Sequence, residues 1–477
     1  MAAMNDLTKN SDCRAGIDQF LPDTIFIGKG LSFWIKGWVF HPRHEIRNVR
    51  FDLDDASIPM EEIHLPRPDV MRKTGSTSLS FDLRKKMLYS GFSGCVDLHQ
   101  DLTGKIKTIH IVAELSDHSE LLIESKTVRF CDETEFFMPC ASDRSADEEY
   151  PLIAICMATY NPDLQLFQKQ IDSIRQQSYP NWICIISDDR STAEIVDEIR
   201  NRIADDQRFI LFENQKNLGF YHNFEQTLRH IPNAAQFIAF ADQDDNWYPD
   251  KLSILYNSII QDPTIKLVYS DMRIIGRKGE IISETYWQNR KNHYQNLELV
   301  MICGSVTGAA SLFRRELLDL VLPFPQNTGI SFHDHLVSCA ALAVGLIEYI
   351  DKPLYDYYQH GRNIIGHHDF GAGYGQVREI ISTEFSTFSG LKNRLRSFYS
   401  SYDLNYLRLR LISRTLSLRG IRNAKAFSLF NNSLLAVIRL LLMHIRIKRQ
   451  KYTTEHAEIA LAVSCLTRKY IKYLPIF

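Results

Sequence analysis

Long hydrophobic runs are missing from this sequence of 477 residues. A helix that spans a membrane needs about 18 uncharged apolar residues in succession. The longest candidate, SLLAVIRLLLMHI at 433–445, is shorter and carries Arg439 in its middle. The opening residues, MAAMNDLTKNSDC, contain no apolar stretch of the kind that marks a secretory signal peptide. We therefore expect a cytoplasmic protein without a spanning helix.

Paired cysteines are missing as well. The nine cysteines are odd in number, scattered along the chain, and never occur as C-x-x-C. This spacing indicates neither a zinc ribbon nor a disulfide framework. Reduced thiols in a cytosolic compartment are the simpler interpretation.

Net charge is small, but it is unevenly spread. The formal net charge is −2. Residues 391–477 hold seventeen Lys and Arg against three acidic residues, a local charge of about +14, which leaves about −16 for the rest. A basic segment of this kind predicts contact with something anionic.

Changes in composition and in the pattern of apolar residues along the chain predict five segments. The apolar content of 45% and the charged content of 23% are those of an ordinary folded protein. We expect a tail at 1–21, a β-sandwich-like domain at 22–131, a linker at 132–150, an α/β domain at 151–370 and a basic helical region at 371–477.

The segment 22–131 has many short runs of β-branched and aromatic residues, separated by turn formers, and no convincing helix. This pattern favours an antiparallel sandwich. Its aromatic residues are expected in the sandwich core, although sugar stacking is the alternative; they are Phe33, Trp34, Trp38 and Phe40.

From Pro151 onward, apolar strands alternate with amphipathic helices. LIAICM is a continuous apolar run, typical of a buried parallel strand, and PDLQLFQKQIDSIRQQ repeats apolar residues at helical spacing. The strands WICIIS, FILFE and FIAFA follow, each after a helix. The alternation predicts βαβ units, with a parallel sheet covered by helices on both faces.

Four consecutive strands of this domain end in small or acidic polar groups. In an open parallel sheet the ligand binds at the carboxyl ends of the strands. One such turn could be a helix cap, but four together predict a ligand cleft. The groups are Ala158–Pro162, Asp188–Ser191, Asn214 with Asn217–Gly219, and Asp242–Asp245.

The turn Asp242–Asp245 is the sharpest of these signals. Three carboxylates in four residues repel one another unless a cation neutralises them, and hard oxygen ligands select Mg²⁺ or Mn²⁺. The alternative is a solvated turn that caps the helix beginning near Pro249. The strand before the turn and the polar strand ends beside it favour a metal site.

The ordered set of these segments resembles the family 2 glycosyltransferases, which are inverting enzymes of the GT-A fold. The resemblance covers residues 151–368. It rests on ATYN, SDDRS, NLGFYHNF, FADQDDNWYPDKL, VTGAASLFRR, a His-Asp pair and QHGRNIIG, in that order. It implies a nucleotide-sugar donor, a divalent metal, and a glycan or lipid-linked acceptor.

The resemblance also implies roles for individual residues. In the donor site, Thr159, Tyr160 and Asn161 would line the nucleotide pocket, Asp188 or Asp189 would bind the base, Asn217 and Gly219 would close the floor, Asp242 would face the ribose and sugar, and Asp244 would bind the metal. Asp242 is a second metal candidate, and the role of Gln243 stays open.

Asp334 is the candidate general base that would deprotonate the acceptor hydroxyl. The His333-Asp334 pair is the form common among rhamnosyltransferase-like members of the family, which favours rhamnose from a dTDP- or UDP-sugar. Because an apolar helix follows, an N-cap aspartate is the alternative. His333 and His335 could suggest zinc instead, but no third ordered ligand accompanies them.

Two further segments complete the expected site. Thr307 and Gly308 would begin a strand on the acceptor side. QHGRNIIG would fold over the diphosphate, with His360 reaching the metal or phosphate and Arg362 the pyrophosphate, although a plain surface loop is the alternative.

The basic C-terminal region permits two interpretations. AVIRLLLMHIRIKRQK suits an amphipathic helix lying on an anionic membrane, which would make the protein peripheral to the inner face of the cell membrane. A helical subdomain packed on the catalytic domain is the alternative. No nucleic-acid partner is expected, since no recognised binding module accompanies the charge.

The sequence thus predicts a glycosyltransferase of surface polysaccharide biosynthesis. A carbohydrate-binding or scaffold protein with a degenerate transferase domain would have lost Asp244 or Asp334, and both are present. A dinucleotide enzyme would need a Gly-rich turn after the first strand of the α/β domain, where this chain has Ala-Thr-Tyr-Asn-Pro.

Overall fold

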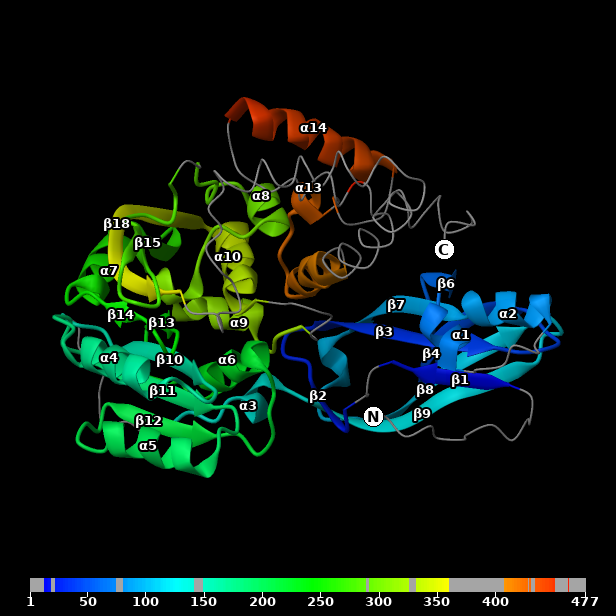
Figure 1. Cartoon of the computed structure of the whole chain (residues 1–477). Coiled ribbons are helices and arrows are strands. Elements are labelled where there is room, and N and C mark those ends of the chain that lie inside the picture. Colours follow the sequence, from blue (N-terminus) through cyan, green and yellow to red (C-terminus); the bar gives the residue numbers. More distant parts are fainter. Residues whose placement is uncertain are drawn as a thin grey trace. The chain divides into compact units, whose positions relative to one another are not determined.

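The structure is a computed structural model that describes residues 13–18, 22–73, 80–140, 149–288, 291–325, 332–359, 407–427, 429, 434–450 and 462. These residues fall into two compact units (Figure 1). The first holds the described residues up to Phe136 together with Arg410–Gly420, and the second holds those from Phe137 to Leu409 and from Ile421 onward.

The first unit is a β-sandwich. One sheet has the order β1-β3-β7-β6 and the other β2-β9-β8-β4-β5, and all printed pairings are antiparallel except β2 with β9. The strands are β1 (Arg14–Ile17), β2 (Thr24–Phe26), β3 (Leu31–Phe40), β4 (Ile46–Leu53), β5 (Ala56–Pro59), β6 (Glu62–Leu65), β7 (Gly91–Leu98), β8 (Ile106–Leu115) and β9 (Glu120–Cys131).

The sequence missed the helices of this unit. They are α1 (Pro68–Lys73), α2 (Phe81–Leu88), a short turn η1 (Gln100–Leu102) and α3 (Glu133–Phe136). The helix α2 is hard to recognise, since its Lys and Asp residues leave only Met87 buried. Its start is fixed by Ser80, whose hydroxyl accepts a hydrogen bond from the Leu83 amide.

Three of the four aromatic residues of β3 are buried, as the sequence predicted for all four. Phe33, Trp34 and Phe40 are buried, and Trp38 is half-buried and stacks on Phe40. Apolar residues from both sheets form one continuous cluster that includes Phe33 and Phe51. Phe40 belongs to a second, smaller cluster with Val70 and Met87, against which Trp38 packs, so these rings contribute to the packing of the first unit.

A basic stretch late in the chain belongs to this first unit. Arg414 makes a two-pronged ion pair with Asp97, with nitrogen–oxygen distances of 3.0 and 2.7 Å. Arg410 pairs with Glu61, and Arg419 donates to the Gly30 carbonyl at 2.9 Å. The charges of Arg410 and Arg414 are therefore balanced by carboxylates of the same unit.

The second unit is an α/β domain around one nine-stranded sheet. Its order is β12-β11-β10-β13-β17-β15-β18-β14, with β16 paired to β15. The first four strands are parallel, and β17 runs antiparallel to both neighbours. The strands are β10 (Ile153–Thr159), β11 (Trp182–Asp188), β12 (Phe209–Glu213), β13 (Phe237–Ala241), β14 (Asn246–Trp247), β15 (Ile265–Ile275), β16 (Ile281–Ser283), β17 (Ser311–Arg314) and β18 (Leu346–Tyr358).

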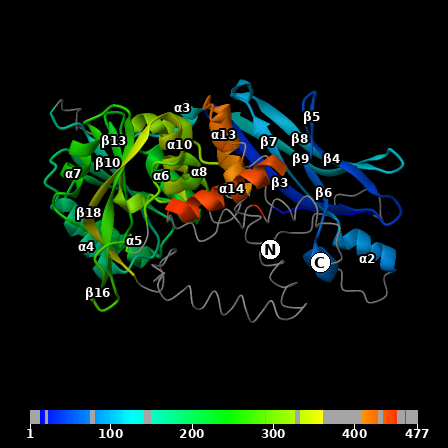
Figure 2. The same cartoon turned by 90° about the horizontal axis from the view of Figure 1, so that it is seen from above.

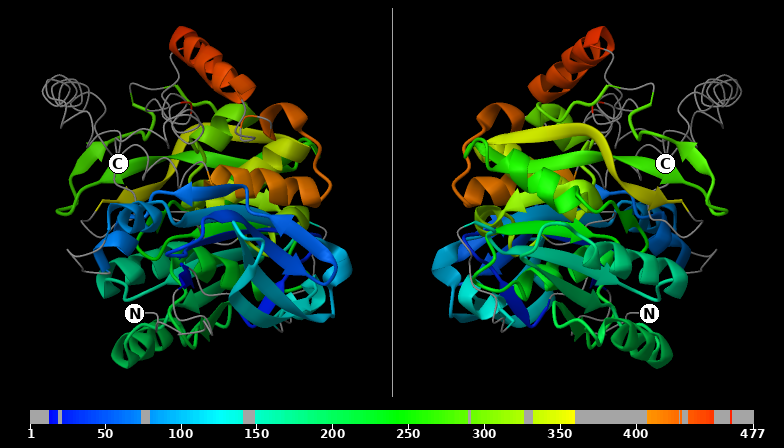
Figure 3. Two further views of the ribbon diagram at one scale, coloured as in Figure 1. Left: turned by 90° about the vertical axis from the view of Figure 1, so that its right-hand side faces the viewer. Right: turned by 90° about the vertical axis from the view of Figure 1, so that its left-hand side faces the viewer.

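Helices alternate with these strands as the sequence predicted. The long strand β18 runs along β15, as Figures 2 and 3 show. The helices are α4 (Leu164–Arg175), α5 (Ala193–Ile203), α6 (Phe220–Arg229), α7 (Lys251–Ile259), α8 (Leu297–Ile302), α9 (Leu318–Val321), α10 (His333–Val344), α13 (Ala424–Phe427) and α14 (Leu434–Gln450), with short turns η2 (Gly308–Ala310) and η3 (Arg315–Leu317).

Burial explains this arrangement. Every residue of β13 is buried, as expected for a strand covered on both faces. The apolar stripe of α4 is buried at Phe167, Ile171 and Ile174, and Asp163 caps the helix by accepting from the Gln165 and Leu166 amides. The α/β prediction is confirmed.

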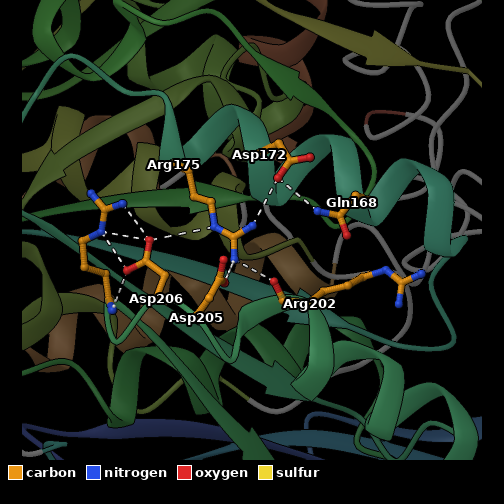
Figure 4. Close-up of polar contacts among 7 residues, drawn as sticks. Gln168, Asp172, Arg175, Arg202, Asp205 and Asp206 are labelled. Atoms are coloured by element: carbon orange, nitrogen blue, oxygen red, sulfur yellow. Dashed lines mark hydrogen bonds and ion pairs between the residues drawn. The ribbon is translucent and has the colours of Figure 1, made fainter.

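An ion-pair network holds α4, α5 and the turn before β12 together (Figure 4). Arg175 pairs with Asp172 at 3.2 Å and with Asp205, and it donates to the Arg202 carbonyl at 2.7 Å. Asp206, also paired with Arg208, lies 3.9 Å from Arg175. This network fixes the first three parallel strands at the sheet edge far from the acidic turn.

Candidate active site

The parallel register brings the predicted polar groups to one edge of the sheet. Thr159 at the end of β10 pairs with Asp188 at the end of β11, and Met157 pairs with Ala241, the last residue of β13. The turn after β13 therefore lies beside the turn after β10. A hydrogen bond of 2.9 Å from the Tyr160 amide to the Gln243 side chain joins the two turns. This bond gives Gln243 a structural role that the sequence left open.

Asp188 and Asp189 are buried and bind the protein's own groups. Asp188 accepts from the Ser191 amide at 2.8 Å and from its hydroxyl at 2.6 Å, and from the Thr159 hydroxyl at 3.0 Å. Asp189 accepts from the amides of Leu218 and Gly219 at 2.7 and 2.8 Å. Both carboxylates thus organise the loops in this state, and base binding by either one stays a prediction.

The loop at Asn217 and Gly219 is held by the same aspartate. The Asn217 side chain donates to the Asp189 carbonyl at 3.0 Å. Gly219 has φ of +77°, a conformation that L side chains rarely adopt, and a Cβ there would meet open space. The backbone conformation, rather than a shortage of room, therefore explains the glycine.

Tyr160 and Asn161 lie at the surface of this edge. The Tyr160 side chain is 52% exposed, and it is among the few large exposed apolar groups of the second unit outside α14. Asn161 has φ of +40°, and its side chain accepts from the Thr192 amide at 3.1 Å. Its own amide donates to the Ser191 hydroxyl at 2.7 Å. The ring of Tyr160 is therefore accessible to a ligand, and the neighbouring residue Asn161 is held by two hydrogen bonds.

The acidic turn carries carboxylates in an electrically unfavourable position. Asp245 is fully buried, and neither of its oxygens accepts a hydrogen bond from the described residues. Burial, together with the charges of Asp244 and Asp334, raises the pKa of Asp242 to about 7. Burial and the charges of Asp242 and Asp244 also raise the pKa of Asp245. An added cation would relieve this repulsion.

Lys251 is a component of this site that sequence reasoning missed. It opens α7, it is fully buried, and it donates to the Ala309 carbonyl. Its ammonium lies 3.7 Å from the centre of the Trp247 ring and 4.3 Å from that of Tyr355. Burial lowers the pKa of Lys251, while the charges of Asp245 and Asp242 oppose that shift. The motif letters D-K-L showed the lysine, but nothing in the sequence showed its burial.

Asp334 lies at the start of α10 and within electrostatic range of the acidic turn. Its carboxylate accepts from the Gly308 amide at 2.9 Å and from the His335 amide at 2.7 Å. The N-cap position belongs to Phe332, so Asp334 is not the cap residue of this helix. Burial raises the pKa of Asp334, the two amides and the charge of Arg408 lower it, and the net result is a pKa of about 6.

The two histidines beside Asp334 face the core. His333 stacks on Phe224 with ring centres 3.6 Å apart, and neither ring nitrogen has a hydrogen-bond partner among the described residues. His335 contacts the Val300 carbonyl through Nε2 at 2.9 Å. Burial lowers the pKa of each to about 3, so both are neutral. A Cβ on Gly308 would lie 2.7 Å from His333 Nε2, which explains that glycine.

One detail of the expected acceptor side is wrong. Thr307 and Gly308 do not begin a strand. Thr307 precedes the 3-10 turn η2, and β17 starts only at Ser311. In this turn the Gly308 amide donates to Asp334 at 2.9 Å.

The expected metal site is only partly visible. Within the described ranges, no group of three or more His, Cys, Asp or Glu side chains is arranged to hold a metal ion. His360 and Arg362 lie outside the described residues. Asp242 and Asp244 remain, and a magnesium-type site commonly uses one or two carboxylates together with substrate phosphates. The donor chemistry of the turn therefore fits such an ion.

Known proteins resemble the second unit. Residues 154–322 match the family model "Glycosyl transferase family 2". The chain is 29% identical over 130 residues to the Escherichia coli UDP-Glc:alpha-D-GlcNAc-diphosphoundecaprenol beta-1,3-glucosyltransferase WfgD, covering 27% of this chain and 48% of that protein. It is 30% identical over 136 residues to the putative colanic acid biosynthesis glycosyl transferase WcaA of E. coli, covering 28% and 46%.

Another relative has no stated function. The uncharacterized protein y4gI of Sinorhizobium fredii is 35% identical over 122 residues, which is 25% of this chain and 13% of that protein. The chain thus spans less than half the length of each of these three relatives. Among solved structures, Staphylococcus aureus TarS 1-349 in complex with UDP-GlcNAc is 15% identical with a TM-score of 0.38, covering 67% of this chain and 91% of that one.

The family match spans the four parallel strands, the acidic turn and β17, but it ends before Asp334. Residues 154–322, about a third of the chain, are therefore similar to a glycosyltransferase family 2 domain.

Proposed function

We propose that this protein is an inverting, metal-dependent glycosyltransferase. It would move a hexose from a nucleotide-sugar to a hydroxyl of a glycan or lipid-linked acceptor in surface polysaccharide biosynthesis. The observation that carries the proposal is that the short turn η2 connects Asp334 with Lys251, the buried neighbour of the acidic turn. The Gly308 amide donates to Asp334 at 2.9 Å, and the Ala309 carbonyl accepts from Lys251. A donor-side carboxylate and a candidate base are thus within range of each other.

In the proposed mechanism, Asp242 and Asp244 hold Mg²⁺ or Mn²⁺ together with the donor diphosphate. The ion would supply Lewis-acid stabilisation of the departing nucleoside diphosphate. His360 and Arg362 are proposed as further contacts to the metal and pyrophosphate. The raised pKa values of Asp242 and Asp245 support the proposed metal binding. A divalent cation would stabilise the ionised carboxylates, whose negative charges otherwise repel one another.

The nucleotide would lie over the turn after β10. Tyr160 offers its exposed ring for stacking, and Asn161, Thr159 and the loop at Asn217 and Gly219 shape the site around it. If Asp188 or Asp189 binds the base, its present hydrogen bonds must be shared or exchanged. The acceptor would approach from the side of Thr307 and Gly308.

Asp334 would act as the general base. Its raised pKa of about 6 lies close to neutral pH, where a base is both deprotonated and able to accept a proton. The Gly308 and His335 amides fix the orientation of its carboxylate. Direct attack by the deprotonated hydroxyl on the face opposite the diphosphate would invert the anomeric centre.

The names of the relatives support the substrate class. WfgD is named for transfer of glucose to a sugar on diphosphoundecaprenol, and WcaA for colanic acid biosynthesis. We propose a lipid-linked or glycan acceptor on this basis. Rhamnose from dTDP- or UDP-rhamnose is proposed from the His333-Asp334 pair.

A thermal-shift screen of nucleotides and nucleotide-sugars, with and without Mn²⁺, tests this function. We expect one nucleoside diphosphate to raise the melting temperature only when the metal is present, since linkage stabilises the state that binds. If no nucleotide does so, the proposal fails. Stabilisation by oligosaccharides alone would favour the carbohydrate-binding alternative.

A further inference from the structure

The helix α14 exposes a continuous apolar surface. Figures 1 and 2 show it as the orange-red helix late in the chain. Six of its large apolar side chains are 44–59% exposed, and we name them the α14 stripe: Leu434, Leu435, Ile438, Leu441, Leu442 and Ile445. On the described residues, no other helix exposes as many large apolar groups.

The spacing of the stripe follows the helical period. At 100° per residue, the six exposed side chains occupy a sector of about 120°. Ala436, Val437, Leu440, Met443 and Ile447 are buried and occupy the opposite sector. The helix is therefore apolar on two faces, and only one of them packs inside the protein.

The charges of α14 have one sign. Its 17 residues contain no Asp or Glu. Arg446, Lys448 and Arg449 are exposed and make no ion pair in the part of the chain that the structure describes. By helical position, Arg446 and Lys448 flank the stripe on opposite sides and Arg449 extends it.

The earlier basic stretch differs in this respect. Arg410 and Arg414 are paired with Glu61 and Asp97. The charges of these two arginines are therefore balanced by direct ion pairs. Arg446, Lys448 and Arg449 of α14 have no such pair among the described residues and can face an anionic surface.

We propose that α14 is a membrane-docking helix whose stripe enters the interfacial layer of an anionic lipid bilayer. The stripe would lie among the acyl chains near the headgroups, and the three cations would pair with lipid phosphates. A symmetric contact with a second copy is less suitable, because it would bring the same cations together. In the described residues no helix is both long and apolar enough to cross a membrane.

This inference goes beyond the proposed activity, since the helix would bind lipid whether or not the domain transfers sugar. The test is co-sedimentation of the full chain with vesicles of phosphatidylcholine alone or of phosphatidylcholine with a quarter phosphatidylglycerol. We expect binding to the mixed vesicles, weak binding to the neutral ones, and a loss of binding as salt rises, because counterions screen the attraction.

Two variants separate the apolar and electrostatic contributions. Ile438→Glu with Leu442→Glu should lower vesicle partitioning at least about tenfold, since two buried-in-lipid groups are lost and two negative charges added. Arg446→Gln with Arg449→Gln should lower it by about fivefold for each charge removed. The matched control is Ile106→Glu, on a 66% exposed residue of the first unit, which should bind like the wild type.

Several outcomes would overturn the proposal. One is equal binding by the stripe variant and the Ile106→Glu control. Another is equal binding to neutral and anionic vesicles. A third is a wild-type dimer in light scattering that becomes a monomer in the stripe variant without any vesicle binding. Metal-dependent stabilisation by nucleotide should be unchanged in both variants, so a failure of the proposed activity would be seen separately.

Discussion

Two aspartates in different units show opposite electrostatic environments. In the first unit, hydrogen bonds from Arg67 lower the pKa of Asp69 to about 2, and burial only partly opposes them. In the second, burial and two neighbouring carboxylates raise the pKa of Asp242 to about 7. The first arrangement stabilises the fold. The second costs stability, which is typical of a site that awaits a ligand.

The same contrast extends to the buried cations. Arg67 binds Asp18 and Asp69 through four nitrogen–oxygen contacts at most 3.0 Å long, so its charge is compensated by direct pairs. Lys251 has aromatic rings and a carbonyl as its direct contacts, and the carboxylates act on it through the field. The direct ion pairs of Arg67 indicate a structural role. Lys251 makes no direct ion pair with the acidic turn among the described residues, so the carboxylates of the turn can still bind a metal ion.

The largest expected effect comes from Asp334→Asn. If Asp334 is the base, sugar transfer should fall by about a thousandfold, because the amide cannot accept the hydroxyl proton. Metal-dependent nucleotide binding should stay nearly intact, as measured by thermal shift. The asparagine side chain can still accept the hydrogen bond from the Gly308 amide, so the fold should be retained. If both transfer and nucleotide binding were lost, Asp334 would be a structural residue rather than the base.

The second largest effect is expected for Asp244→Asn. It should abolish most of the stabilisation that a nucleoside diphosphate gives with Mn²⁺, and transfer should fall by about a hundredfold as metal binding weakens. Asp250→Asn is the matched control, because this exposed aspartate near the turn caps no amide with its side chain. Equal nucleotide responses in the two variants would remove Asp244 from the metal site.

Lys251→Met should affect folding. Removing one partner from a buried set of charges typically costs about 3 kcal/mol, and here it would leave Asp242 and Asp245 without their nearby cation. Urea denaturation measures the change. The exposed Lys278→Met should shift the free energy of unfolding by less than about 0.5 kcal/mol. Similar values for the two would mean that Lys251 compensates nothing.

The smallest effect is expected for Asp69→Asn. Because the folded-state pKa of Asp69 is lowered from 3.8 to about 2, its contribution to stability is present above pH 4 and is lost as the pH falls towards 2. The Asp69 side chain is 44% exposed, so solvent screening should keep this contribution below about 1 kcal/mol. Urea denaturation at pH 6 and pH 3 should show a smaller loss in the variant than in the wild type. An equal loss would contradict the assignment.

Much of the second unit could be predicted from the sequence. The strands around Ile155 and Ala239 are apolar throughout, and each is followed by a helix with an apolar stripe, so local periodicity defines them. The ordered polar strand ends then gave the candidate site. The helices α1 and α2 were missed since α2 buries only Met87, and periodicity is weak where little is buried.

The sequence predicted which residues belong to the candidate site, but not which hydrogen bonds their side chains make. Asp188 and Asp189 were expected to face a ligand, and the structure shows both accepting from their own loops. Asp334 was weighed against an N-cap, and that position belongs to Phe332. Such details depend on one or two residues of helix phase and on side-chain direction, which motif spacing does not specify.

The sequence by itself determined the alternation of strands and helices from β10 to β13, the placement of acidic groups after β13, and the absence of a long apolar span. Local chemistry suffices for these, because they depend on neighbours within a few residues. Only the tertiary structure decided that Lys251 is buried near the acidic turn and that the charge of Asp334 acts on Asp242. It also decided that Arg414 is paired with Asp97, whereas Arg446, Lys448 and Arg449 of α14 are exposed. Burial and charge compensation join residues far apart in the chain, and therefore they exist only once the chain has folded.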